Sequence, residues 1–107
     1  MNALEALAEP TRRRIVELLA GGERSAGEIA SHFETSRPGV SRHLRVLRDH
    51  GLVQVRDDAQ KRFYSLDPTP LAELDAWLAQ YRGYWTNRLD ALDTEIRRRQ
   101  RQRKGKT

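Results

Sequence analysis

Residues 25–51 read SAGEIASHFETSRPGVSRHLRVLRDHG and contain the signals that decide the fold. Ser25 is followed three residues later by Glu28, which is the capping-box spacing and predicts the start of a short helix. Ser36 predicts the start of a second helix, because its hydroxyl can accept a free backbone N–H of the first turn. Gly51 suits the left-handed position that closes this second helix. The stretch therefore predicts two capped helices joined by a short turn.

The second helix has an apolar face and a polar face when its residues are placed at 100° each. Val40, Leu44 and Leu47 fall on one side, and we expect them to face the core. The opposite side is basic and hydroxylated, and it carries Ser41, Arg42 and Arg45. His43 lies beside the core face, so packing and DNA contact are both open for it. Gly39 either allows close backbone approach to a phosphate or is simply tolerated.

The remaining elements follow from periodicity and turn signals on both sides of this stretch. Helical segments are predicted at 3–8, 10–20, from 25, from 37 to 50, and from 71 to 99, with strands at 52–56 and 62–66 joined by a polar stretch, 57–61. This order predicts a mainly α fold with a small β-hairpin, which is the winged helix-turn-helix plan. In that plan the second helix of the pair enters the major groove of DNA.

The charge of the chain is unevenly distributed. The sequence has 107 residues and a formal net charge of +5, but residues 97–107 hold seven of its 20 basic residues and no acid. Residues 1–96 therefore carry a net charge of −2. Within them, residues 36–62 carry +4 and residues 63–96 carry −4. A basic segment centred on the second helix is what a phosphate-binding face needs.

Several function classes are excluded by composition. The absence of cysteine excludes disulfides, thiolate metal sites and a cysteine nucleophile. No nucleophile–base pattern, phosphate-cradling glycine loop or metal-ligand cluster is present, so we expect no enzyme, no cofactor and no bound metal. No apolar run approaches the ~18 residues of a membrane span, and the N-terminus does not resemble a signal peptide. We therefore expect a cytoplasmic protein without a membrane partner.

The wing is predicted to add contacts to the DNA backbone. Arg56, Lys61 and Arg62 lie near the tip of the predicted ribbon, where cations meet phosphate or the minor groove. Such contacts set affinity and salt dependence rather than sequence preference. Asp57 and Asp58 lie beside them and would repel phosphate.

The long predicted helix is expected to form a homodimer interface together with the N-terminal helix. Its expected contacts are Leu4, Leu7, Leu74, Trp77, Leu78, Tyr81, Trp85, Leu89 and Leu92. Two-fold symmetry would place two recognition helices about one DNA turn apart, which matches a palindromic operator. Four aromatic residues of the helix, which we call the aromatic cluster, are Trp77, Tyr81, Tyr84 and Trp85. As an alternative, they line a pocket for a small-molecule effector. We expect one domain over 1–99, its dimerisation helix at about 70–99, and a disordered basic tail over 100–107.

Several segments resemble the ArsR family of bacterial repressors. Residues 6–15 (ALAEPTRRRI) resemble the opening helix pair of that family. Residues 36–44 (SRPGVSRHL) and 51–53 (GLV) resemble its recognition helix and first wing strand, and residues 62–66 (RFYSL) resemble its second strand. The resemblance covers roughly residues 3–96. It implies a homodimeric DNA-binding transcriptional regulator, usually a repressor that a signal releases from its operator.

Position by position, the resemblance implies a DNA-reading set. Its members are Ser36, Arg37, Pro38, Ser41, Arg42, His43 and Arg45. Metal-sensing members carry cysteines before the turn, or histidines and acids on the last helix. This chain has no cysteine and no histidine after His50, so it resembles the branch that does not sense metals.

Two other functions compete with the regulator. A winged-helix module for protein–protein contact would leave Arg42 and Arg45 unused, so its binding would not change when both are replaced. A non-specific nucleoid-binding protein would act through the basic tail. Deletion of residues 97–107 separates that function from specific binding, because a specific binder keeps its preference ratio when it loses tail contacts.

Overall fold

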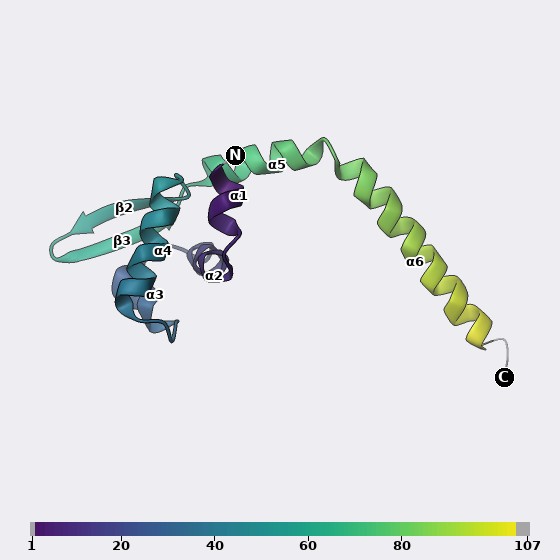
Figure 1. Ribbon diagram of the computed structural model, residues 1–107, viewed down its shortest axis with the longest axis horizontal. Coiled ribbons are helices and arrows are strands. Elements are labelled where there is room, and N and C mark those ends of the chain that lie inside the picture. Colours follow the sequence, from purple (N-terminus) through teal and green to yellow (C-terminus); the bar gives the residue numbers. More distant parts are fainter. Residues whose placement is uncertain (1, 105–107) are drawn as a thin grey trace. The chain divides into compact units, whose positions relative to one another are not determined.

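The computed structural model describes residues 2–104, and the chain divides into two units, residues 1–74 and 75–107. The elements, labelled in Figure 1 where there is room, are α1 (Asn2–Leu7), α2 (Pro10–Leu19), β1 (Arg24–Ser25), α3 (Ala26–Ser31), α4 (Arg37–Asp49), β2 (Val53–Asp58), β3 (Lys61–Leu66), α5 (Pro68–Ala79) and α6 (Arg82–Lys104). Elements α1 to β3 lie in the first unit, and α5 crosses the boundary between the two. The mainly helical fold with a small antiparallel sheet is as predicted.

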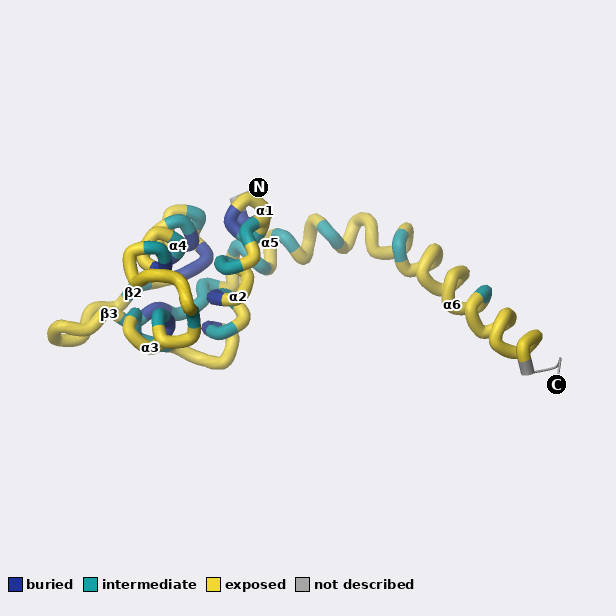
Figure 2. Tube along the Cα trace, turned by 60° about the horizontal axis from the view of Figure 1, so that its bottom comes forward, coloured by how far each residue is buried: buried dark blue, intermediate teal, exposed yellow. Residues whose placement is uncertain are grey.

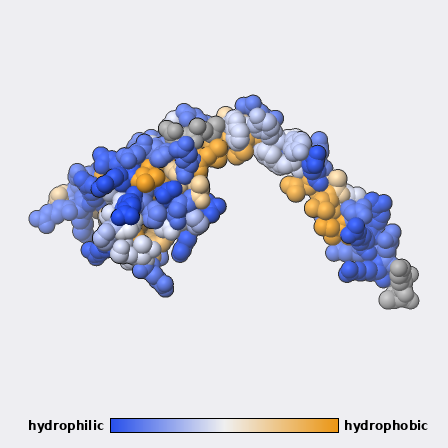
Figure 3. Space-filling view, viewed as in Figure 1, coloured by the Kyte–Doolittle hydropathy of each residue, from blue (hydrophilic) through white to orange (hydrophobic). Residues whose placement is uncertain are grey.

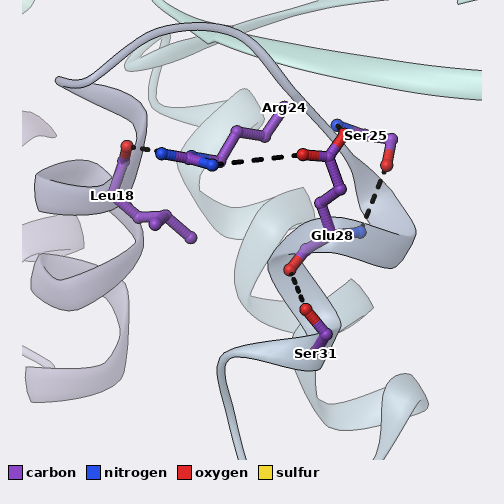
Figure 4. Close-up of polar contacts among 5 residues, drawn as sticks. All are labelled: Leu18, Arg24, Ser25, Glu28 and Ser31. Atoms are coloured by element: carbon purple, nitrogen blue, oxygen red, sulfur yellow. Dashed lines mark hydrogen bonds and ion pairs between the residues drawn. The ribbon is translucent and has the colours of Figure 1, made fainter.

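The short helix α3 begins at the capping box that the sequence predicts. The Glu28 amide donates to Ser25 Oγ over 3.1 Å, and the Ser25 amide donates back to Glu28 Oε1 over 3.3 Å (Figure 4). Arg24 joins this cap to the end of α2, because its Nε donates to the Leu18 carbonyl over 3.4 Å. Two orphan backbone donors are satisfied in this way, and the start of α3 is fixed.

Both ends of α4 are also closed as predicted. Ser36 Oγ accepts from the Gly39 amide over 3.3 Å, which caps the N-terminus. At the other end Gly51 adopts φ +75°, the left-handed conformation that favours glycine. The amides of Gly51 and Leu52 donate to the carbonyls of Arg48 and Leu47, each over 2.9 Å. This pair of bonds is the Schellman arrangement, and it directs the chain from α4 into β2.

The sheet is larger than predicted. It has three antiparallel strands in the order β1-β3-β2, and the two-residue strand β1 was not predicted. The predicted polar loop 57–61 is wrong, because residues 57, 58 and 61 belong to the strands. Register explains this: Asp57 faces Arg62 and Asp58 faces Lys61, and opposite charges stabilise cross-strand positions. The turn is therefore tight, and Ala59 adopts φ 55° within it.

The core of the first unit lies between α1, α2, α3, α4 and the sheet (Figure 2). All three residues of the predicted apolar face of α4 are buried, together with Ile15, Leu19 and Ile29. Val53 and Tyr64 complete the core from the sheet, and Leu52 adds to it just before β2. The recognition-helix candidate is therefore held along one whole face, which leaves the opposite face free for function.

The predicted helix over 71–99 is wrong as a single element. It is interrupted at residues 80–81, where the amides of Gln80 and Tyr81 donate to carbonyls only three residues earlier. Gly83 follows in the first turn of α6, and its low helix propensity is consistent with a break here. The predicted end at 99 also moves, since residues 100–104 continue α6, and residues 105–107 lie outside the described residues. Across residues 2–104, no helix combines the length and apolar character that crossing a membrane requires.

Candidate nucleic-acid interface

The outward face of α4 is polar and exposed, and it begins at the capped N-terminus of the helix. The residues of this face that the sequence predicts are exposed: Ser36, Arg37, Pro38, Ser41, Arg42 and Arg45. Within residues 2–104, no carboxylate forms an ion pair with Arg37, Arg42 or Arg45 at 4.0 Å or less. These three guanidinium groups therefore keep their donors free for an external partner.

Two hollows run along this face of α4. The first lies between α3 and α4 and includes Arg37 and Ser41 in its lining. The second reaches from α4 to β3 and is lined by Ala26, Ser41, Leu44, Arg45, Arg48, Arg62 and Tyr64. Three arginines from two elements thus converge on one concave surface, as an anionic backbone would require.

Arg48 belongs to this surface, and the sequence prediction missed it. It is exposed and lies three residues after Arg45 and seven after Ser41, so helical spacing puts all three on one side. That spacing was a usable signal.

His43 does not belong to the outward face. Its Nδ1 lies 3.4 Å from Arg12 Nη1 and 3.7 Å from Glu9 Oε2, and its side chain is largely covered. The imidazole therefore packs α4 against α2, and its inclusion in the DNA-reading set is corrected. The physical reason is its place on the helix, where it flanks the buried face and meets a neighbouring helix.

Glu9 and Arg12 stabilise this junction between α1, α2 and α4. The Glu9 side chain caps α2 by accepting from the Arg12 amide over 2.9 Å. Arg12 Nε in turn donates to the Ala6 carbonyl over 2.6 Å. Desolvation would raise the pKa of Glu9, but the Arg12 amide, the charge of His43 and hydrogen bonds from Thr11 outweigh it, so the pKa is lowered. The carboxylate is thus kept ionised, as a helix N-terminus favours.

Arg56, which the sequence placed in the DNA-contacting set, is exposed but is paired with acidic side chains of the protein. Its Nη2 donates to Glu23 Oε1 over 2.7 Å, its Nε donates to Glu23 Oε2 over 3.3 Å, and its guanidinium lies 4.7 Å from the Phe63 ring centre. The hydrogen bond from Arg56 lowers the pKa of Glu23. Asp58 lies 3.6 Å from the same guanidinium. This bidentate pair occupies the fork that phosphate would use, so Arg56 would have to exchange Glu23 for a phosphate in order to contact DNA.

The other two wing cations differ from Arg56. Lys61 and Arg62 are both exposed. Arg62 Nε lies 3.4 Å from Asp57 Oδ1, an exposed pair of the kind that contributes little energy. Arg62 also lines the hollow that it shares with α4. Arg62 is therefore the wing residue that is best placed to act with α4.

Gly39 has a steric role at the turn. A Cβ built on it would lie 2.6 Å from Cγ2 of Thr35 and 3.4 Å from Oγ of Ser36. The first of these distances is far below van der Waals contact. The turn and the first turn of α4 therefore approach closely only because residue 39 lacks a side chain.

We expect Gly39→Ala to lower the free energy of unfolding by up to about 2 kcal/mol. Overpacking costs about 1–3 kcal/mol, which exceeds the gain of about 1 kcal/mol in helix propensity. Thr35→Ser removes the clashing methyl group, so the double variant should be at least as stable as Thr35→Ser alone. Urea denaturation of the four proteins measures the coupling. A coupling energy of zero would show that the Thr35 methyl is not the obstacle.

The aromatic cluster lies in the second unit and is mostly exposed. Trp77 and Tyr81 make an edge-to-face pair with ring centres 5.4 Å apart. The Arg88 guanidinium lies 4.6 Å from the ring centre of Tyr84. Trp85 is half-buried. Among the described residues, no three His, Asp or Glu side chains converge as metal ligands would.

Comparison with known proteins gives a consistent set of relatives. Residues 7–56 match the family described as a helix-turn-helix domain. The chain is 38% identical over 80 residues to the transcriptional repressor SdpR of Bacillus subtilis (strain 168), covering 75% of this chain and 89% of that protein. It is 47% identical over 88 residues to an HTH-type transcriptional regulator of Mycobacterium tuberculosis (strain ATCC 25618 / H37Rv), covering 82% and 79%. Among solved structures, an ArsR family transcriptional regulator matches with a TM-score of 0.72 and 28% identity, covering 78% and 87%.

Proposed function

Because this chain belongs to the ArsR family of DNA-binding transcriptional regulators, we propose that α4 is its recognition helix. The observation that carries the proposal is the exposed outward face of α4, where Ser41, Arg42 and Arg45 point away from the core. The opposite face of the helix is anchored along its length in the core. A helix held this way can enter the major groove without changing its own packing.

The residues of this surface divide into two roles. Arg42 and Arg45 can pair with O6 and N7 of guanine, and Ser41 can bond a base edge or a phosphate. Contacts to the phosphate backbone are assigned to Ser36, Arg37, Arg48, Lys61 and Arg62, which lie at the helix start, along α4 and on the wing. Pro38 can add only van der Waals contact at the start of the helix, because it has no N–H to donate. The first group sets the sequence preference and the second sets affinity and position.

We propose that the regulator acts as a homodimeric repressor. The relative SdpR is a transcriptional repressor, which supports repression rather than activation. On α6, Trp85, Leu89, Leu92 and Ile96 recur at steps of four, three and four, which forms one stripe along the helix. Figure 3 shows hydrophobic surface along this middle part of α6. Leu89 is 60% exposed and Leu92 is 56% exposed, so a second copy of the chain has apolar surface to cover.

Leu92→Asp is expected to weaken the dimer at least tenfold, by about 1.4 kcal/mol or more. The new carboxylate would have to be desolvated without a partner in an apolar interface. Sedimentation at several protein concentrations measures the change. Thr94→Asp is the matched control, because it puts the same charge on the opposite side of α6. Equal weakening by both variants, or by neither, would place the interface elsewhere.

Selection of bound sequences from a random DNA pool tests the function as a whole. The expected product is an inverted repeat whose half-sites lie about one helical turn apart, ~34–36 Å. Transcription from a promoter that carries this sequence should fall when the protein is supplied. A pool with no enrichment would reject sequence-specific recognition, and enrichment of a single half-site would reject the symmetric dimer.

The small-molecule effector stays a prediction. Its expected site is the aromatic cluster formed by Trp77, Tyr81, Tyr84 and Trp85, which lies at the end of α5, in the break after it and at the start of α6. The edge-to-face pair at Trp77 and Tyr81 supports ring stacking as the mode of recognition. Quenching of tryptophan fluorescence by aromatic compounds, compared with a Tyr84→Ala variant, tests it.

A further inference from the structure

The C-terminal part of α6 differs in chemistry from the rest of the helix. Residues 82–96 carry the hydrophobic stripe and a net charge of −1. Residues 97–107 contain no hydrophobic residue and no acid, but seven basic residues. Residues 97–103 are helical and exposed, and Figure 3 shows hydrophilic surface over this part of α6. This segment has nothing to bury in an apolar contact, so its interactions are ionic.

Only the first arginines of the segment are compensated by acids. Arg97 pairs with Asp93 over 3.2 Å, and Arg98 and Arg99 pair with Glu95 over 2.6 Å and 3.3 Å. No acid follows Glu95 in the sequence, and within residues 2–104 no ion pair at 4.0 Å or less involves Arg101 or Arg103. The charge that is left uncompensated therefore lies at the end of the helix.

The same arrangement makes the helix respond to an anion. Arg97 and Arg101 are four residues apart, as are Arg99 and Arg103, and like charges at this spacing destabilise a helix. A row of external negative charges would remove this repulsion. It would therefore stabilise the helical form of the segment while the segment binds.

We propose that residues 97–104 bind the phosphate backbone of duplex DNA beside the site that α4 reads, without reading bases. The inference rests on the proposed function of α4, since DNA held there puts flanking phosphates at a high effective concentration for a tethered basic segment. The segment lacks the apolar face of a membrane-surface helix. It also lacks the aromatic side chains on which single-stranded bases stack. The phosphate backbone of duplex DNA is the polyanion that fits the basic side chains of this segment.

The test compares Arg101→Gln/Arg103→Gln with the wild-type chain on the operator selected above. One duplex ends at the operator, and a second carries flanks of about two helical turns, ~20 bp, on each side. Glutamine keeps a helix propensity close to that of arginine, so α6 is preserved. The matched control is Arg82→Gln/Arg88→Gln, which removes two charges from the same helix outside the basic segment.

On the flanked duplex, the slope of log K against log[salt] should become less steep in the variant by about 0.9–1.8 for each bound protomer, which corresponds to one or two phosphate contacts per protomer. The slope on the unflanked duplex and the ratio of operator to random-sequence affinity should not change. An unchanged slope on the flanked duplex would overturn the inference, as would an equal loss in the control. The inference would also be overturned if the wild-type chain bound anionic vesicles or single-stranded DNA as tightly as it binds random duplex. If the wild-type chain showed no preference for the operator, the role of α4 would be rejected instead. The role of residues 97–104 would then still be decided by comparing the salt slopes of the wild-type chain and the variant on random duplex.

Discussion

Arg42→Ala is expected to weaken binding to the operator by about 1–3 kcal/mol and to relax discrimination at one base position. Arg42 is exposed in the N-terminal half of α4, and the described part of the chain offers it no ion pair at 4.0 Å or less. A guanidinium that is free of protein carboxylates keeps both donors of its planar fork for guanine O6 and N7. The loss should therefore be specific to one base pair in each half-site rather than spread over all DNA.

Titrations of the operator, of the operator changed at each position, and of random duplex measure this effect. Arg48→Ala is the control, because Arg48 lines the hollow shared with β3 and is assigned to phosphate. It should weaken binding uniformly across sequences and reduce the salt slope by about 0.9 for each bound protomer. Equal losses for Arg42→Ala on operator and random DNA would show that this arginine does not read a base.

Leu47→Ala is expected to lower the free energy of unfolding by about 2–5 kcal/mol. The Leu47 side chain is fully buried, and it lies on the face of α4 that packs against the core. Truncation removes apolar contacts and leaves a cavity in a core that is thin, because a chain of this size buries a limited share of its surface. The same change should weaken DNA binding, since it removes the packing that positions α4.

Urea denaturation at a fixed protein concentration measures the loss, because dimerisation makes stability depend on concentration. Leu47→Met is the graded control: it conserves volume and should cost less than about 1.5 kcal/mol. A methionine variant less stable than the alanine variant would contradict the cavity explanation. An alanine variant within about 0.5 kcal/mol of wild type would show that residue 47 is not part of the core.

The parts of the fold that the sequence predicts correctly all depend on short-range geometry. The capping box joins Ser25 to Glu28, the second cap joins Ser36 to Gly39, and Gly51 closes α4 through bonds that reach back only a few residues. The apolar face of α4 follows in the same way from a period of 3.6 residues. Such signals are complete within a few residues, so no knowledge of the remaining chain is required.

The differences at His43, Arg56 and β1 concern partners that are distant along the chain. His43 meets Arg12, 31 residues away, and Arg56 meets Glu23, 33 residues away. Both side chains are polar and lie near the proposed DNA surface, so local pattern gave no reason to separate them from Arg42 or Arg62. The two-residue strand β1 is not predictable from local pattern for the same reason, because it exists only through its pairing with β3.

The sequence by itself therefore determined where α4 begins and ends and which of its faces is buried. These properties follow from backbone hydrogen bonds and periodicity inside one segment. Only the tertiary structure decided which cations are free to meet DNA. A guanidinium or imidazole has the same local sequence signal whether a carboxylate from another element holds it or not, and folding alone brings that carboxylate within 4 Å.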